Sequence, residues 1–206
     1  MLRGLLILGL VYSASAGARA IELTLTARAL AEAIDLGQTR VAALRTRAHA
    51  VYRVAASTPP IDYIEVVTPF RRVALAAEEG GSSRRFGQRD ALAILDAAPQ
   101  RVDVVLELTF HPFNTYVGVP DYQVRLLPAA AGDAPIVIPT TIERIPRSGP
   151  RIDGMPRSLP NSGPLTGGRL VARFDGAALG AGVYDVTMVE GGKEIARVRV
   201  DFRGMR

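Results

Sequence analysis

The stretch GVYDVTMVEGGKEIARVRVDF, residues 182–202, decides the fold class because it contains two runs that alternate between apolar and polar residues. The apolar positions are Tyr184, Val186 and Met188 in the first run and Ala196, Val198, Val200 and Phe202 in the second. A period of two is typical of β-strands with one buried face. Between the runs, Gly191 and Gly192 supply the positive φ angles that a tight turn requires. The stretch therefore predicts a closing β-hairpin.

The same period of two recurs upstream. Its apolar positions are Val102, Val104, Leu106, Leu108 and Phe110, then Tyr122, Val124 and Leu126, and later Leu170, Ala172 and Phe174. In the first of these runs the intervening positions include Asp103 and Glu107, which we expect on a solvated face. Several such strands separated by turn signals predict an antiparallel sandwich with one apolar face per sheet.

A strand and two helices precede these runs. Residues 61–67 are rich in β-branched side chains and tyrosine, which favours a strand. Thr68 has the character of a helix N-cap, and Pro69 occupies the first helical position, where its missing N–H costs nothing. The apolar spacing then predicts helices over 69–79 and 88–98. Two short helices are therefore inserted between strands.

The C-terminal part of the chain also carries a short motif. Between RLVARFDGAALGAGVYDV and RVRVDF, a leucine, a small turn and a Gly-x-Tyr lead into a strand, at Leu179, Gly180, Gly182 and Tyr184. These roughly 35 residues resemble the last three strands of immunoglobulin-like or fibronectin-type-III-like modules of bacterial secreted proteins. The resemblance implies an architecture and no functional residues. We expect an α+β fold, an antiparallel immunoglobulin-like β-sandwich over residues 57–206 with two short inserted helices.

The N-terminus predicts export. MLRGLLILGLVYSASAGARA has a basic start, an apolar centre and a small-residue ending at Ala18-Arg19-Ala20, which is typical of a signal peptide over residues 1–20 with Ile21 as the first mature residue. The apolar centre is about half the ~20 residues that a membrane span needs. The sequence has no cysteine, which excludes both a lipid-anchoring thiol and disulfides. We expect a periplasmic or secreted protein without a transmembrane segment after cleavage; a retained N-terminal anchor is the alternative.

A helical lead-in over residues 21–56 follows the signal. Small and apolar residues recur at steps of three and four at Leu30, Ile34, Val41, Leu44, Ala48 and Val51. Because Gly37 is unfavourable inside a helix, we predict two short helices broken at DLGQ and packed on their own domain. A self-associating N-terminal helix remains a second possibility.

The charge pattern argues against nucleic-acid binding. Two of the 25 basic residues lie in the predicted signal, which leaves 23 basic against 20 acidic residues, a net charge of +3. Only Lys193 is a lysine, so arginine supplies almost all of the positive charge. A surplus this small gives little electrostatic attraction for a polyanion.

The sequence contains no diagnostic catalytic, nucleotide or metal motif, so we expect no cofactor and no metal site. With His49 and His111 as the two histidines, zinc ligation would need carboxylates to complete a ligand set. A periplasmic hydrolase stays open as an alternative if it uses His111 or the carboxylates Glu65, Glu107 and Asp121. The main expectation for these carboxylates is a solvated position on a strand.

The stretch TFHPFNTYVGVPDY, residues 109–122, is predicted to connect two strands. We expect His111 and Asn114 to hydrogen-bond backbone groups of its turns. Its apolar residues are Phe113, Tyr116, Val117 and Val119, and we expect them to pack over the end of the sandwich or against the helices. Loops on a rigid sheet often carry binding groups, so His111, Asn114 and Tyr116 are candidate partner contacts.

A second candidate surface spans residues 142–168, which are rich in proline and arginine. Arg144, Arg147, Arg151 and Arg157 are predicted to lie on an extended, exposed chain, where guanidinium groups can bind phosphate or carboxylate. Taken together, these features favour a non-catalytic extracytoplasmic binding or assembly protein whose partner is a protein or an anionic component of the envelope.

Overall fold

The computed structural model describes residues 21–80, 86–129, 135–149, 164–180 and 182–206, and the predicted signal peptide lies outside these ranges. The helices are α1 (Ala27–Gln38), α2 (Ala42–Ala50), α3 (Pro69–Gly80) and α4 (Gln88–Asp96). The strands are β1 (Arg53–Ala55), β2 (Ile61–Val67), β3 (Arg101–Thr109), β4 (Gln123–Pro128), β5 (Thr141–Ser148), β6 (Leu165–Asp175), β7 (Val183–Glu190) and β8 (Lys193–Asp201). The α+β class predicted from the sequence is confirmed.

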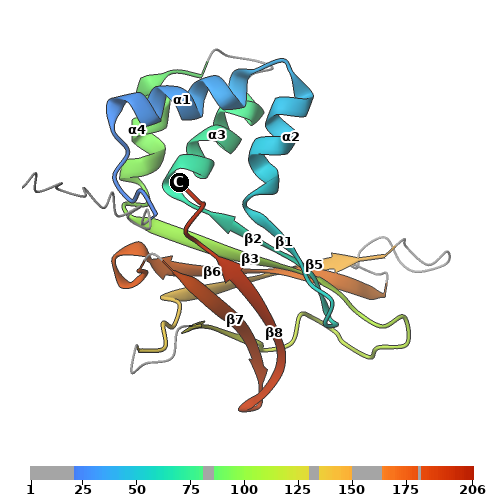
Figure 1. The fold of residues 1–206 in the computed structure, drawn as a ribbon. Coiled ribbons are helices and arrows are strands. Elements are labelled where there is room, and N and C mark those ends of the chain that lie inside the picture. The colour runs from blue at the N-terminus through green and yellow to red at the C-terminus, as the bar shows by residue number, and fades with distance from the viewer. Residues whose placement is uncertain (1–20, 81–85, 130–134, 150–163, 181) are drawn as a thin grey trace, which may run out of the picture.

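The strands form two antiparallel sheets with the orders β1-β2-β3-β6-β5 and β4-β7-β8. The four helices lie together on one side of the five-stranded sheet, and β7 and β8 lie on its other side (Figure 1). The architecture is therefore three layers: helices, first sheet and second sheet. None of the helices in the described part of the chain is long and apolar enough to cross a membrane.

The closing hairpin forms as predicted. Gly191 and Gly192 have φ angles of +56° and +85°, which lie in the left-handed region that favours glycine. The turn brings Glu190 opposite Lys193 and sets the register of β7 and β8. Tyr184 lies at the start of β7, and its hydroxyl accepts a hydrogen bond of 2.8 Å from the backbone N–H of Gly180, which precedes the strand.

The apolar alternation fills the space between the sheets. Fully buried residues from β2, β3 and β6 meet those from β4, β7 and β8, as the period of two requires. Residues with 0% exposure include Ile64, Val66, Val102, Val104, Leu106, Leu108, Leu126, Leu170, Val186, Met188 and Val200. This single core holds the two sheets together.

The acidic side chains of β3 and β7 are buried, and our prediction of a solvated face for Asp103 and Glu107 is wrong. Both side chains are buried on β3, and Asp185 is buried on β7. β3 and β7 each have a hydrogen-bonded strand on both sides, so side chains of the neighbouring strands cover them. A buried carboxylate needs a charged partner, and arginine supplies it here.

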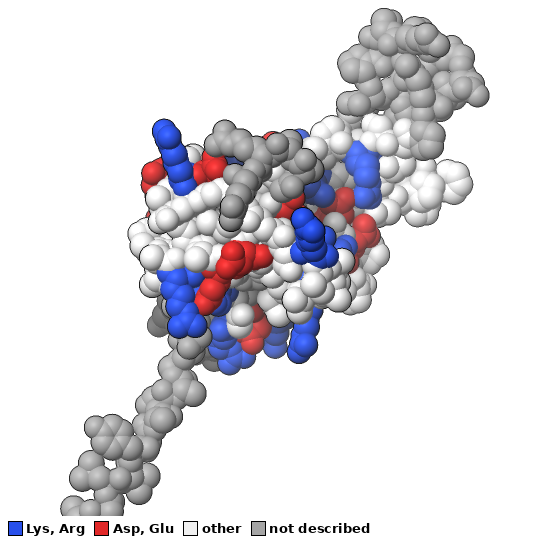
Figure 2. Space-filling view, turned by 90° about the horizontal axis from the view of Figure 1, so that it is seen from above, with Lys and Arg blue, Asp and Glu red and all other residues white. Residues whose placement is uncertain are grey.

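Two arginines pair with each of these three carboxylates. The pairs are Arg72 and Arg101 with Asp103 at 3.3 and 2.9 Å, Arg147 and Arg169 with Glu107 at 2.6 and 3.0 Å, and Arg197 and Arg199 with Asp185 at 3.7 and 3.0 Å. The planar guanidinium group presents several N–H donors in a fixed geometry, which suits this repeated role better than lysine. On the face seen from above the helices, basic and acidic side chains are likewise interspersed (Figure 2).

The helical layer has its own small apolar cluster, formed by Ala29, Leu30, Ala33, Phe70, Val73 and Ala91. The two short helices predicted for the lead-in are present, but DLGQ belongs to the last turn of α1, and the break falls directly after Gln38. The reason is close packing: a side chain at Gly37 would meet the Ala74 carbonyl oxygen and would come within 2.7 Å of the Ala77 Cβ. Gly37 therefore lets α1 approach α3. By contrast, α2 has no buried residue, and its Leu44 and the N-cap residue Val41 are more than half exposed.

Arg71 of α3 joins the helical layer to the first sheet. It is 3% exposed, donates to the Val66 carbonyl at 2.8 Å, forms an ion pair with Glu65 at 3.3 Å, and places its guanidinium group 5.2 Å from the centre of the Tyr52 ring. The predicted cap of α3 is also present, because the Thr68 hydroxyl accepts a hydrogen bond from the Arg71 N–H at 3.2 Å. Cap and buried arginine together fix the direction in which α3 leaves β2.

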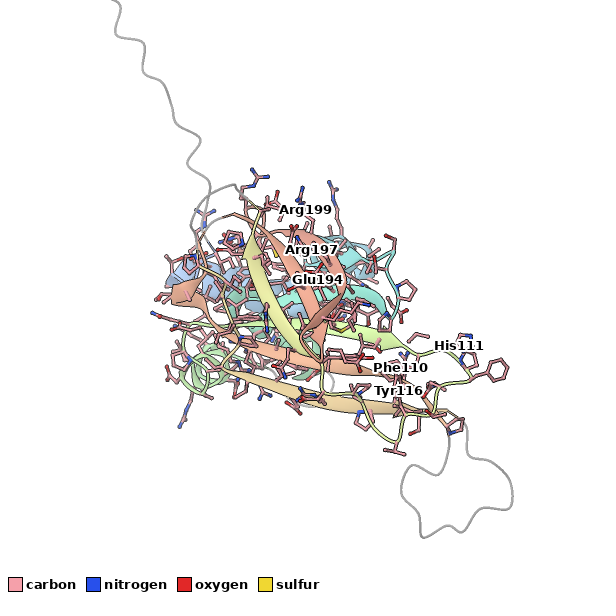
Figure 3. The ribbon with its side chains drawn as sticks, turned by 90° about the horizontal axis from the view of Figure 1, so that it is seen from below. Phe110, His111, Tyr116, Glu194, Arg197 and Arg199 are labelled. Carbon is pink, nitrogen blue, oxygen red and sulfur yellow. The ribbon has the colours of Figure 1, made fainter. Side chains whose placement is uncertain are left out.

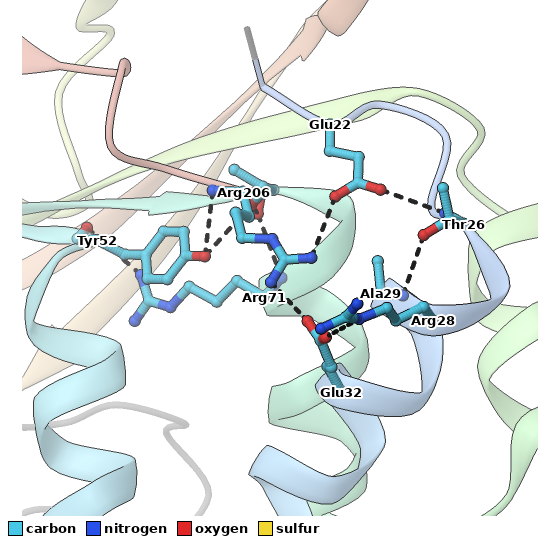
Figure 4. Close-up of polar contacts among 9 residues, drawn as sticks. Glu22, Thr26, Arg28, Ala29, Glu32, Tyr52, Arg71 and Arg206 are labelled. Atoms are coloured by element: carbon cyan, nitrogen blue, oxygen red, sulfur yellow. Dashed lines mark hydrogen bonds and ion pairs between the residues drawn. The ribbon is translucent and has the colours of Figure 1, made fainter. Parts of the chain in front are cut away.

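The segment after β8 lies against the junction between the helical layer and the first sheet (Figures 1 and 4). Arg206 pairs with Glu32 of α1 at 2.7 Å and with Glu22 at 3.6 Å, and its carbonyl oxygen accepts hydrogen bonds from Thr68 and Tyr52. Hydrogen bonds from Arg28 and Arg206 lower the pKa of Glu32. The end of the second sheet is thus connected to the helices.

We expect Arg71→Met to lower the free energy of unfolding by about 2–4 kcal/mol, because it leaves the Val66 carbonyl and Glu65 without their charged partner. Urea denaturation measures this loss. The matched control is Arg28→Gln, whose i,i+4 pair with Glu32 is exposed and contributes only ~0.5 kcal/mol. Equal losses in the two variants would contradict the role given to Arg71.

We also expect Gly37→Ala to destabilise the protein by about 1–3 kcal/mol, although alanine is the better helix former, because the added methyl group collides with α3. Thermal unfolding followed by circular dichroism measures the change. Gly80→Ala is the control, since among the described residues its new Cβ would have no neighbour closer than 3.5 Å. An unchanged or raised melting temperature for Gly37→Ala would refute the close contact.

Candidate functional site

The connection between β3 and β4, residues 110–122, is the strongest candidate site, and it lies at one end of the molecule (Figure 3). Its two ends are anchored in the core. Phe110 is 5% exposed and its N–H donates to the Thr166 carbonyl at 2.9 Å, whereas Tyr122 is 2% exposed at the other end. The loop therefore extends from the molecule between two ends that are held in the core.

The first turn of the loop is closed by His111 and Asn114, which confirms their predicted structural role. The Asn114 amide donates to the His111 carbonyl at 2.7 Å and to the Leu165 carbonyl at 2.9 Å, and its oxygen accepts from the Tyr116 N–H at 3.0 Å. The His111 Nδ1 accepts from the Phe113 N–H at 3.2 Å. With Nδ1 engaged as an acceptor, the neutral ring carries its proton on Nε2.

The apolar side chains of the loop divide into two groups. Tyr116 makes an edge-on contact with the Phe110 ring at 5.0 Å, and Val119 packs against the core. Burial, and next a hydrogen bond with Tyr116, raise the pKa of the Tyr122 phenol. These contacts bind the base of the loop to the sandwich.

The tip of the loop points into solvent, so our prediction that all its apolar side chains pack on the protein is wrong. The exposed fraction of Phe113 is 87%, and Val117 is fully exposed. The physical reason is local: the hydrogen bonds of His111 and Asn114 close a turn that carries the tip away from the sheets. Two apolar side chains are thereby presented on an ordered backbone.

The arginines predicted for anion binding hold the two ends of this loop instead. Arg147 lies on β5 and donates to the Leu108 carbonyl at 2.9 Å and to the Thr109 hydroxyl at 2.8 Å, at the entry. Arg144, also on β5, donates to Asp121 and to the Tyr122 carbonyl at the exit. These two residues lie on an extended strand, as predicted, but their guanidinium groups are paired within the protein. Arg151 and Arg157 lie outside the described residues.

The error has a clear cause. Residues 141–148 form the edge strand of the first sheet rather than part of a long connection, and this strand places Arg144 and Arg147 beside the two ends of the loop. Arg169, which completes the pair on Glu107, was not indicated by the sequence pattern either. It lies directly opposite Glu107 in the β3–β6 register, and only that register reveals the contact.

The candidate catalytic carboxylates are all engaged. Arg147 and Arg169 occupy the two oxygens of Glu107, Arg71 pairs with Glu65, and Arg144 pairs with Asp121. The hydrogen bond with Glu107 raises the pKa of Arg169. Among the described residues, no group of three or more histidine, cysteine, aspartate and glutamate side chains could hold a metal ion.

The comparisons with known proteins give no family for this chain. No protein-family model matches it, and neither the curated proteins nor the solved structures contain a significant match. The functional assignment therefore depends on the geometry of the loop and of the strands that hold it.

Proposed function

We propose that this protein is a non-catalytic extracytoplasmic binding or assembly protein that uses the loop of residues 110–122 to contact a protein partner. The single observation that carries the proposal is the exposure of Phe113 and Val117 at the tip of a loop whose two ends are fixed. The extracytoplasmic location is proposed from the signal pattern of residues 1–20.

An immunoglobulin-like architecture belongs to the same proposal. The orders β2-β3-β6-β5 and β4-β7-β8 correspond to the A-B-E-D and C-F-G orders of an immunoglobulin constant-type sandwich. The contact from the Tyr184 hydroxyl to Gly180 corresponds to the tyrosine corner of that fold, which ties the start of strand F to the residues before it. In these terms, α3 and α4 are inserted between strands A and B, and β1 extends the edge of the first sheet.

The proposed architecture also supports a binding role for the loop of residues 110–122. It connects strands B and C, and in immunoglobulin variable domains this connection belongs to the end of the sandwich that binds antigen. Binding residues are often carried by loops on a rigid scaffold. An ordered loop also loses little conformational entropy on binding, so its apolar contacts contribute more fully to affinity.

The chemistry of the tip favours a protein partner over an anionic one. Phe113 is an aromatic side chain that can enter a pocket on a partner and exclude water from the contact. Arg144 and Arg147 are already engaged in ion pairs, so they offer little charge to an envelope polymer or a lipid headgroup. An anionic envelope component is therefore the second candidate partner.

The alternative of a periplasmic hydrolase has less support. A general base needs a proton-accepting atom that faces the substrate, yet Nδ1 of His111 accepts from the backbone and both oxygens of Glu107 accept from arginine. In this arrangement, His111 stabilises the loop of residues 110–122, and Glu107 holds the arginines of β5 and β6 against β3.

The double variant Phe113→Asp with Val117→Asp tests the proposal. We expect it to weaken binding of the mature protein to its envelope partner by about 10- to 100-fold, because an apolar anchor at an interface contributes ~2 kcal/mol or more. The partner is first recovered from the envelope protein fraction, and its affinity is then measured by biolayer interferometry.

The control for this experiment is Leu92→Asp, which places the same charge on an exposed apolar residue of α4. Its affinity and melting temperature should match those of the wild type. If the wild type instead binds vesicles rich in phosphatidylglycerol, with an affinity that falls steeply as salt rises, the anionic candidate replaces the protein partner.

Arg147→Gln tests whether the fixed loop end matters. We expect a loss of about 1–3 kcal/mol in stability, because Glu107 stays buried with one arginine fewer. We also expect faster hydrogen exchange of the loop amides and weaker partner binding. The second change Glu107→Gln should recover part of the stability, since it removes the charge that Arg147 neutralised. Unchanged exchange in the loop would show that Arg147 does not hold it.

A further inference from the structure

A second site lies on the other side of the first sheet, where α2 and α3 meet β1 and β2. A cleft of about 420 Å³ opens there, which is within the size range of small-molecule sites. Its lining residues are Ala42, Arg45, Thr46, His49, Ala50, Arg53, Glu65 and Glu78. The loop of residues 110–122 contributes no residue to it, so the two sites are separate.

The two carboxylates of the cleft are neutralised within the protein. Glu78 of α3 pairs through one oxygen with Arg45 at 2.9 Å and through the other with His49 at 3.3 Å. Glu65 of β2 pairs with the buried Arg71 at 3.3 Å. Neither carboxylate therefore repels a bound anion with its full charge, and neither is free to bind a cation.

Arg53 is the charged group of the cleft that no carboxylate neutralises among the described residues. Its guanidinium group lies 3.4 Å from the centre of the Tyr63 ring, and the two residues belong to paired strands. Stacking uses the face of the guanidinium plane and leaves the N–H groups on its edge available. The Tyr63 ring thus orients the guanidinium group of Arg53 and leaves its N–H groups able to donate hydrogen bonds to a ligand.

The wall of the cleft also contains a hydroxyl group that can donate a hydrogen bond to a ligand. The Thr46 hydroxyl makes no hydrogen bond within the part of the chain that the structure describes. Nδ1 of His49 is buried and has no hydrogen-bond partner there, while Nε2 of the same ring contacts Glu78. Because Nε2 of the neutral ring donates to the Glu78 carboxylate, Nδ1 is an acceptor and does not bind an anion. Thr46 is therefore the hydrogen-bond donor that the wall supplies.

We infer that this cleft binds a small organic anion that carries a carboxylate or phosphate group. Arg53 supplies the charge and a bidentate pair of donors, and the Thr46 hydroxyl supplies a hydrogen bond from the wall. Ala42 and Ala50 leave room for a compact, partly apolar body beside the charged group. Because Glu78 and Glu65 are neutralised by ion pairs, the remaining charge of the cleft is that of Arg53, which is positive and favours an anion.

The experiment is a titration of the isotope-labelled mature protein, followed by NMR chemical shifts, with three probes at one ionic strength: citrate, inorganic phosphate and sodium chloride. We expect saturable shifts of Thr46, His49 and Arg53 with citrate or phosphate. Saturation by citrate alone identifies a carboxylate site, and saturation by phosphate alone identifies a phosphate site. Equal shifts with sodium chloride, or none that saturate, overturn the inference.

Three variants assign the binding to the cleft. Arg53→Gln should weaken binding about tenfold or more, as expected for loss of a charged hydrogen bond. Tyr63→Leu keeps the charge but removes the stacking surface, and it should weaken binding by a smaller factor. Arg203→Gln, at an exposed arginine that pairs with Asp201 beyond β8, should bind like the wild type. If Arg53→Gln folds normally and keeps full affinity, the inference is wrong.

Discussion

A carboxylate on the central strand of a sheet cannot remain buried without a partner, and this constraint organises the outer faces of both sheets. Asp103, Glu107 and Asp185 each pair with two arginines. The arginines come from α3 and β3 for Asp103, from β6 and β5 for Glu107, and from β8 for Asp185. The arginines in turn reach other backbone carbonyls: Arg72 bonds to that of Arg101, and Arg147 to that of Leu108. The near-absence of lysine from the sequence is consistent with this role, since a compact ammonium group cannot span two acceptors in a plane as a guanidinium group does.

Local signals carried most of the secondary structure in the sequence. The alternation in residues 182–202, the glycine pair at the turn, and the cap at Thr68 with Pro69 are set within a few residues, so the hairpin and α3 could be predicted. The same locality explains the correct role of His111 and Asn114, whose bonds in the turn span two or three residues.

The errors at Glu107 and Gly37 have a different property, because each depends on contacts between residues far apart in the chain. Glu107 meets Arg147 across 40 residues and Arg169 across 62, so neither burial nor pairing can be read from the strand alone. Gly37 suggested a break because its benefit lies in α3, which packs against it. The cleft between α2 and β2 was missed for the same reason, as His49 and Glu78 are 29 residues apart.

The insertion of α3 and α4 between two neighbouring strands also bears on how the chain reaches its native state. β2 and β3 are hydrogen-bonded partners, yet the chain between them passes through both helices. Helices form from local contacts and in less time than strands that pair over long distances. Once α3 and α4 have formed, the ends of β2 and β3 are joined by a compact connector, and the entropy lost on closing that loop is smaller than for a flexible chain of the same length. The helical insertion is thus suited to bring together β2 and β3 of the five-stranded sheet, next to which β6 and then β5 are placed.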